Sequence, residues 1–129
     1  KQFKIVKATY SESLIYEAYG GLQNDGIMLA VYYDVDAAKI IHQLDSWEKI
    51  NDSPTISSIL KNVSSYFGLD FVIPEIASGN FFLYDNSQHK ELRSEAEMNT
   101  LLLHSEDVNF SLVVWDDEKH TIYIVEYRI

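Results

Sequence analysis

The sequence predicts a single α+β domain over residues 1–129, with a mostly antiparallel or mixed sheet that packs against about three to four helices. Three observations lead to this fold class. Strand-like apolar runs and amphipathic stretches of helical period occur in mixed order, without the strict alternation of a doubly wound α/β fold. The C-terminus carries two adjacent strand-like runs, and a length of 129 residues suits one domain with one core.

The C-terminal runs predict a β-hairpin around which the rest of the chain packs. Val108–Trp115 and His120–Ile129 are rich in β-branched and aromatic residues, and a polar turn at 116–119 joins them. Because side chains alternate along a strand, Phe110 points to one face and Trp115 to the other. Strands that are apolar on both faces are typical of the interior of a sheet, so we expect the hairpin there.

Two further strands are expected before the first clear helix. Phe3–Thr9 alternates loosely, and Ile27–Tyr33 is a continuous apolar run behind a turn. The intervening residues 11–22 stay open between strand and helix. Four of their apolar side chains fit a helical stripe: Leu14, Ile15, Ala18 and Leu22.

Two helices with clear start signals follow. Asp34 is the expected N-cap of the first, with Asp36 in its first turn and apolar residues at helical spacing as far as Trp47. Ser53 is the expected cap of the second helix, which ends at Gly68. Because few residues separate the two, we expect them to be neighbours in a helix–helix connection.

Another hairpin and a third helix are expected before the C-terminal strands. Leu69–Ile73 and Phe81–Tyr84 read as strands that pair with each other, and a polar loop follows at Asp85–Lys90. Ser94, with a glutamate three residues later, matches the capping box of a helix that ends near His104.

Charge is the least ordinary property of the chain, which has 20 acidic residues against 10 lysines and arginines. Nucleic acid and anionic membrane surfaces repel such a chain, so we expect a basic protein partner and no direct nucleic-acid or membrane binding. Seven acids form an acid block that no lysine or arginine interrupts: Glu95, Glu97, Glu106, Asp107, Asp116, Asp117 and Glu118.

No motif in the sequence indicates catalysis, a cofactor or a metal. The absence of cysteine excludes disulfides and thiolate metal sites and favours a cytoplasmic protein. Asp116, Asp117 and His120 are candidates for a cation site, but such residues are typical of hairpin turns. Asp34 and Asp36 resemble the start of a calcium loop and are better explained as helix-capping residues. We therefore expect a protein that is not an enzyme and holds no cofactor or metal.

In these properties the chain resembles the small immunity proteins of bacterial toxin systems, such as those of contact-dependent growth inhibition and other polymorphic toxins. The acid block and the interleaved aromatic residues Trp115 and Tyr123 carry the resemblance. It implies a protein that binds a basic nuclease toxin and covers its substrate site, with the acids speeding the encounter. The expected partner-binding residues are Glu95, Glu97, Glu106, Asp107, Trp115, Asp116, Asp117, Glu118 and Tyr123.

Three other functions stay open: a nucleic-acid mimic that inhibits another partner, a structural subunit, and a small enzyme or ligand-binding domain. The last would have its pocket between the sheet and the helices 34–47 and 53–67. The acids also have an equally simple structural explanation as helix caps, a turn and a solvated rim.

Overall fold

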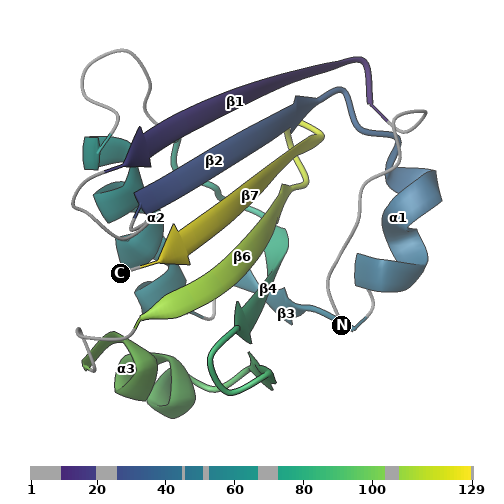
Figure 1. Cartoon of the computed structure of the whole chain (residues 1–129). Coiled ribbons are helices and arrows are strands. Elements are labelled where there is room, and N and C mark those ends of the chain that lie inside the picture. Colours follow the sequence, from purple (N-terminus) through teal and green to yellow (C-terminus); the bar gives the residue numbers. More distant parts are fainter. Residues whose placement is uncertain are drawn as a thin grey trace.

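An antiparallel sheet forms the centre of the structure (Figure 1). A computed structural model describes residues 10–19, 26–44, 46–50, 53–66, 73–103 and 108–128. Within these residues the strand order is β1-β2-β7-β6-β4-β3, and β5 pairs with β4 on the same edge as β3. The strands are β1 (Glu12–Tyr19), β2 (Gly26–Tyr33), β3 (Glu48–Lys49), β4 (Gly79–Asp85), β5 (Lys90–Leu92), β6 (Asn109–Asp116) and β7 (Thr121–Arg128).

The predicted C-terminal hairpin lies inside this sheet. β6 and β7 pair with each other, while β7 also pairs with β2 and β6 with β4. Their turn occupies residues 117–120, one residue later than expected. Side chains on both faces of β6 are buried, with Leu112 on one face and Trp115 on the other. The α+β class, the mostly antiparallel sheet and the interior hairpin are confirmed.

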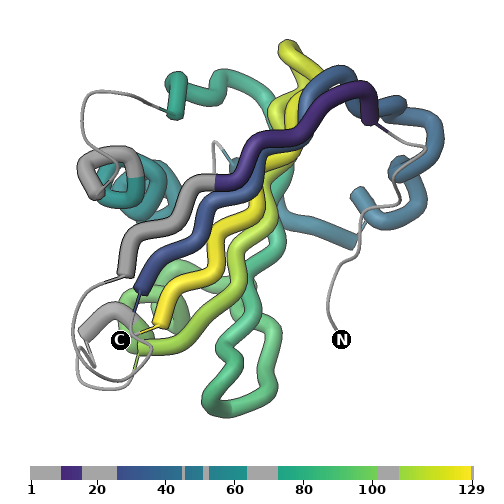
Figure 2. The backbone as a smooth tube through the Cα atoms, turned by 45° about the horizontal axis from the view of Figure 1, so that its top comes forward, coloured from purple at the N-terminus to yellow at the C-terminus, as the bar shows by residue number. Residues whose placement is uncertain are grey.

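Helices cover both faces of the sheet. The described residues contain three of them, α1 (Ala37–Leu44), α2 (Pro54–Tyr66) and α3 (Glu95–Leu103). Ile56 of α2 and Met98 of α3 pack with Leu112 in a larger core on one face. Ile40 of α1 packs with Trp115 in a smaller core on the other. Figures 1 and 2 accordingly show α1 and α2 on opposite sides of the sheet.

The expected direct connection between the first two helices is wrong. Strand β3 lies between α1 and α2 in the chain and pairs with β4 at the edge of the sheet. The linker therefore passes round this edge and carries the chain from one face to the other. An apolar stripe indicates that one side of a helix is buried, but not which layer buries it.

Residues 11–22, left open between strand and helix, contain strand β1. It pairs with β2 from Glu12 opposite Tyr33 to Tyr19 opposite Gly26. The stretch contains isoleucine and tyrosine, which favour strands. The local spacing of apolar residues fits a helix about as well as a strand. Backbone hydrogen bonding to β2 therefore decides in favour of the strand.

The predicted starts of the second and third helices are correct. Ser53 Oγ accepts a hydrogen bond from Ile56 N at 3.2 Å, which caps α2. Ser94 Oγ accepts one from Glu97 N at 3.1 Å, and the glutamate reciprocates, since Ser94 N donates to Glu97 Oε1 at 3.2 Å. This is the expected capping box of α3.

The predicted cap of the first helix is wrong by two residues. Ala38 N donates to Asp36 Oδ1 at 3.1 Å, so Asp36 and not Asp34 caps α1. Asp34 instead has a positive φ of 53° and accepts a hydrogen bond from the Ser11 hydroxyl at 2.7 Å. Its side chain ties the end of β2 to the start of β1.

Several expectations in the middle of the chain have other outcomes. The expected strand Phe3–Thr9 and most of Leu69–Ile73 lie outside the described residues. Phe81–Tyr84 is part of β4, which pairs with β6, β3 and β5. The expected loop at Asp85–Lys90 is the turn into β5, a strand that was not predicted. In the part of the chain that the structure describes, no helix has the length and apolar character needed to cross a membrane.

Candidate functional site

The fold separates the acid block into two groups at opposite ends of the sheet. Lys90, shortly before α3, lies opposite Asp85 in the β4–β5 ladder. Asp85 in turn lies opposite Phe110, near the start of β6. The turn acids follow the end of the same strand. Figure 1 shows α3 at one end of the sheet and the β6–β7 turn at the other. The acid block is therefore not one continuous surface; Glu106 and Asp107 lie outside the described residues.

Glu97 is engaged within the fold at the start of α3. Its Oε1 closes the capping box, and its Oε2 lies 3.0 Å from Lys90 Nζ. The Lys90 ammonium, assisted by hydrogen bonds from Ser94 and from the Arg93 backbone, lowers the pKa of the Glu97 carboxyl to about 2.

Glu95 faces α2 and not a partner. Its Oε2 accepts a hydrogen bond from the Thr55 hydroxyl, which joins α3 to α2. Burial acts to raise the pKa of Glu95, but hydrogen bonds from Ser53 and Thr55 outweigh it and hold the pKa below its ordinary value. Both acids of α3 thus stabilise the helix and its packing.

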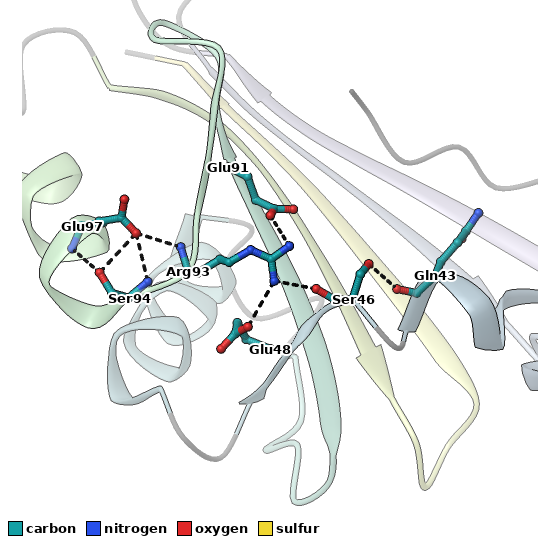
Figure 3. A network of polar contacts seen from close by, with 7 residues as sticks. All are labelled: Gln43, Ser46, Glu48, Glu91, Arg93, Ser94 and Glu97. Atoms are coloured by element: carbon teal, nitrogen blue, oxygen red, sulfur yellow. Dashed lines mark hydrogen bonds and ion pairs between the residues drawn. The ribbon is translucent and has the colours of Figure 1, made fainter.

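Arg93 forms ion pairs with two further acids near α3 (Figure 3). Its guanidinium pairs with Glu91 and, at 3.2 Å, with Glu48, and it donates to the Ser46 carbonyl at 2.7 Å. The network joins the α1–β3 linker to β5. All three ion pairs between described residues lie in this region, because the third joins Lys90 to Glu97.

The two expected aromatic anchors lie inside the protein. Trp115 is 1% exposed in the smaller core, and Tyr123 is 3% exposed in the larger core. Burial, and then the nearby Asp116 and Tyr33, raise the pKa of Tyr123 to about 12. Both faces of the hairpin are covered, so neither side chain forms part of the candidate surface.

Asp116 is a structural residue of the β6–β7 turn. It is 2% exposed, and its Oδ1 accepts hydrogen bonds from Glu118 N at 3.1 Å and Lys119 N at 3.2 Å. Asp117 is exposed, and the Trp115 indole donates to its Oδ1 at 3.4 Å. Of the three turn acids, Asp117 and Glu118 are available at the surface.

Further acids gather at the end of the sheet that carries this turn. The loop between β2 and α1 lies against the turn, because Val35 N donates to the His120 carbonyl at 2.8 Å. Glu12 of β1 lies at the same end, opposite Tyr33. We call this set the acidic end; all its members are exposed, and they are Glu12, Asp34, Asp36, Asp117 and Glu118.

Among the described residues, acids outnumber lysines and arginines at the acidic end. Two exposed lysines, Lys39 and Lys119, are near its members in the chain, against five acids. None of the three ion pairs between described residues includes an acid of this set. Around α3, by contrast, Lys90 and Arg93 form direct ion pairs with Glu97, Glu91 and Glu48, although acids outnumber bases there as well. The acidic end is therefore the stronger candidate for attracting a positively charged surface.

Sequence reasoning identified two of these acids and missed three. Asp117 and Glu118 belong to the acid block, whereas Glu12, Asp34 and Asp36 were not expected to contact a partner. The available signal was Asp34-Val-Asp36 directly after a buried strand. In an antiparallel sheet the end of one strand lies beside the start of its neighbour, so acids at these positions gather at one end of the sheet. Among the described residues, no group of three or more His, Cys, Asp or Glu side chains is arranged to hold a metal.

Three comparisons with known proteins give no match: one with protein-family models, one with curated proteins and one with solved structures.

Proposed function

We propose that this protein is a non-catalytic inhibitor that binds a basic protein partner through its acidic end. The proposal is supported by one observation above all. Five exposed acids from three segments gather there, and none of them takes part in the ion pairs between described residues, which all lie near α3. Fixed charges of one sign at one end of a sheet raise the rate at which an oppositely charged surface is encountered.

Within this class, we propose an immunity protein of a bacterial toxin–immunity system, acting in the cytoplasm on a nuclease-type toxin domain. A nuclease binds a polyanion, so its substrate site is basic, and an acidic surface of another protein can occupy it. The net charge of −10 adds a long-range attraction to such a site. No step of this function requires a catalytic residue.

The competing prediction of one pocket between the sheet and its first two helices has little support. α1 and α2 lie on opposite faces, so no single pocket can be lined by the sheet and both helices. The space between the sheet and α2 is occupied by buried side chains such as Ile56, Leu60 and Leu112.

The test uses the protein encoded immediately upstream, which the proposal expects to be a basic toxin. Asp117→Asn with Glu118→Gln removes two negative charges, and asparagine keeps an acceptor for the Trp115 indole. We expect the association rate at low salt to fall several-fold and its salt dependence to flatten, as measured by stopped-flow fluorescence.

Ser58→Lys with Ala96→Lys is the matched control, because it changes the net charge by the same amount at exposed positions of α2 and α3, away from the β6–β7 turn. It should leave most of the rate intact. The unaltered protein should also suppress the nuclease activity of the upstream product at a one-to-one ratio. Absence of a complex, or equal rates for Asp117→Asn with Glu118→Gln and for the control, contradicts the proposal.

A further inference from the structure

A hollow of about 460 Å³ lies between the β4–β5 hairpin and α3. Its volume is in the range of small-ligand sites, roughly 300–1,000 Å³. Apolar side chains of Leu92 and Leu101 form part of its wall, and Asp85, Lys90 and Glu97 supply its charged groups. It lies at the opposite end of the sheet from the acidic end and shares Lys90 and Glu97 with the charged group at the start of α3.

The charges in the hollow do not cancel. Lys90 Nζ and Glu97 Oε2 are 3.0 Å apart and neutralise each other. Asp85 is only 4% exposed, and its Oδ1 accepts hydrogen bonds from Ser87 N at 2.9 Å and Gln88 N at 3.3 Å. None of the ion pairs between described residues includes Asp85. Both of these hydrogen bonds use Oδ1, so Oδ2 has acceptor capacity for a ligand in the hollow.

Asp116 shows which part of this arrangement points to a ligand. It ends β6 as Asp85 ends β4, is 2% exposed, and accepts hydrogen bonds from the same two positions of its turn. Burial and turn capping are therefore common to both aspartates and have a structural explanation. Asp85 in addition lines the hollow, with its apolar wall and its Lys90–Glu97 ion pair.

We propose that this hollow binds an organic cation consisting of a guanidinium or ammonium group on an aliphatic stem, with Asp85 as its counter-ion. Asp85 Oδ2 accepts neither of the two hydrogen bonds of the turn, which both use Oδ1. A guanidinium can donate charge-assisted hydrogen bonds to Oδ2. Leu92 and Leu101 contact the stem, and the Lys90–Glu97 pair borders the entrance. The ligand is either a free small molecule or a basic side chain of a protein, and both offer the same chemistry.

The test is a titration of the full-length ¹⁵N-labelled protein with butylguanidinium, followed by amide chemical shifts. We expect saturable shifts in residues 85–92 and 97–101, and none with butylurea, which has the same stem without the charge. Asp85→Asn keeps the acceptor for the turn and removes the charge, so it should weaken binding about tenfold or more. Asp116→Asn, the matched control, should bind as the unaltered protein does.

Two further arms complete the experiment. Thr100→Trp fills the hollow from its exposed side without altering Asp85, and it should abolish the shifts even if Asp85→Asn fails to fold. A blocked Gly-Arg-Gly peptide identifies the source: saturable binding assigns a protein side chain, and binding of butylguanidinium alone assigns a free cation. Equal binding of butylguanidinium to Asp85→Asn and to the unaltered protein, or no shifts near the hollow, overturns the proposal. Neither result bears on the acidic end.

Discussion

Gly79 lies where a side chain has no room. It begins β4 opposite Asp116, and a Cβ atom at this position would lie 1.9 Å from the backbone oxygen of Trp115. The contact is with the main chain of β6, so a rotamer change of a neighbour does not relieve it. β4 and β6 would have to separate to admit a methyl group.

We therefore expect Gly79→Ala to lower the free energy of unfolding by about 1–3 kcal/mol, as overpacking does elsewhere. Urea denaturation followed by tryptophan fluorescence measures the loss. Ser78→Ala, one residue earlier at an exposed position, is the control and should change stability by less than about 0.5 kcal/mol. Equal stability of the two variants would show that the strands separate easily here.

Glu126 is a half-buried acid on the face of the sheet that α1 covers in part. Burial raises the pKa of its carboxyl, and hydrogen bonding from the Ser111 hydroxyl at 2.6 Å and the nearby Arg128 offset this only partly. The folded protein therefore holds this proton more tightly than the unfolded chain. Stability then falls as pH rises from the ordinary pKa of 4.5 through the raised folded value.

Glu126→Gln should remove this loss, because glutamine keeps the acceptor for Ser111 and does not ionise. Thermal melts between pH 2 and pH 7 should show a smaller decrease in stability above pH 4.5 for the variant. Glu97→Gln is the control of opposite sign. The folded pKa of about 2 means that Glu97 stabilises above pH 4.5, and that this stabilisation is lost as pH falls toward 2. If Glu126→Gln leaves the slope above pH 4.5 unchanged, the carboxyl is not perturbed.

At the scale of elements, α1 offers two adjacent isoleucines in opposite environments. Ile40 is 4% exposed in the smaller core, while Ile41 is 51% exposed. We expect Ile40→Ala to lower the free energy of unfolding by about 2–5 kcal/mol. Apart from the difference in helix propensity between isoleucine and alanine, Ile41→Ala should lower it by less than about 1 kcal/mol. Chemical denaturation of both variants decides whether α1 packs on the sheet through this side. Similar losses would mean that the helix is rotated.

The two hairpin turns share a sequence pattern that explains their shape. Asp85 and Asp116 each end a strand and cap a loop of four residues. His89 and His120 take the last loop position with positive φ values of 54° and 50°. Both turns therefore read Asp-x-x-x-His, but the sequence interpretation recognised a hairpin only at the second. The first was hidden because β5 is three residues long and has no apolar run.

Local signals predicted the elements better than their placement. Ser53 and Ser94 identify helix starts because a cap is made by residues three positions apart. The face on which α1 lies depends on β3 pairing with β4, a contact between residues about thirty positions apart that no local pattern encodes. Strand β1 likewise depends on its partner β2.

At the scale of the whole molecule, charge clusters follow the sheet and not the sequence. The acid block was inferred from proximity in the chain, and the fold sends α3, which contains Glu97, and the β6–β7 turn, which contains Asp117, to opposite ends of the sheet. The acidic end brings together Glu12, Asp34 and Asp117, which are far apart in sequence. Composition predicted that a negative surface exists; strand register, which composition does not specify, determines where it lies.

The order of the strands also predicts how the molecule opens. β6 and β7 have a hydrogen-bonded neighbour on each side, whereas β1 pairs only with β2 among the described residues. Leu112 and Val125 are fully buried, while Leu14 and Ile15 of β1 are 40% and 61% exposed. Because β1 has one strand neighbour among the described residues and these two side chains are already partly exposed, we expect its opening to cost less than global unfolding, which is on the order of 5–15 kcal/mol.

Native-state hydrogen exchange should therefore find the slowest amides in residues 110–115 and 122–125, exchanging with the free energy of global unfolding. Amides of β1 should exchange faster, through local opening. Leu112→Ala should lower the protection of the slow amides by its full cost of about 2–5 kcal/mol and leave the β1 amides nearly unchanged. If β1 amides were as slow as those of β6 and fell with them in this variant, the sheet would open as one unit, and the C-terminal hairpin would not be its most stable part.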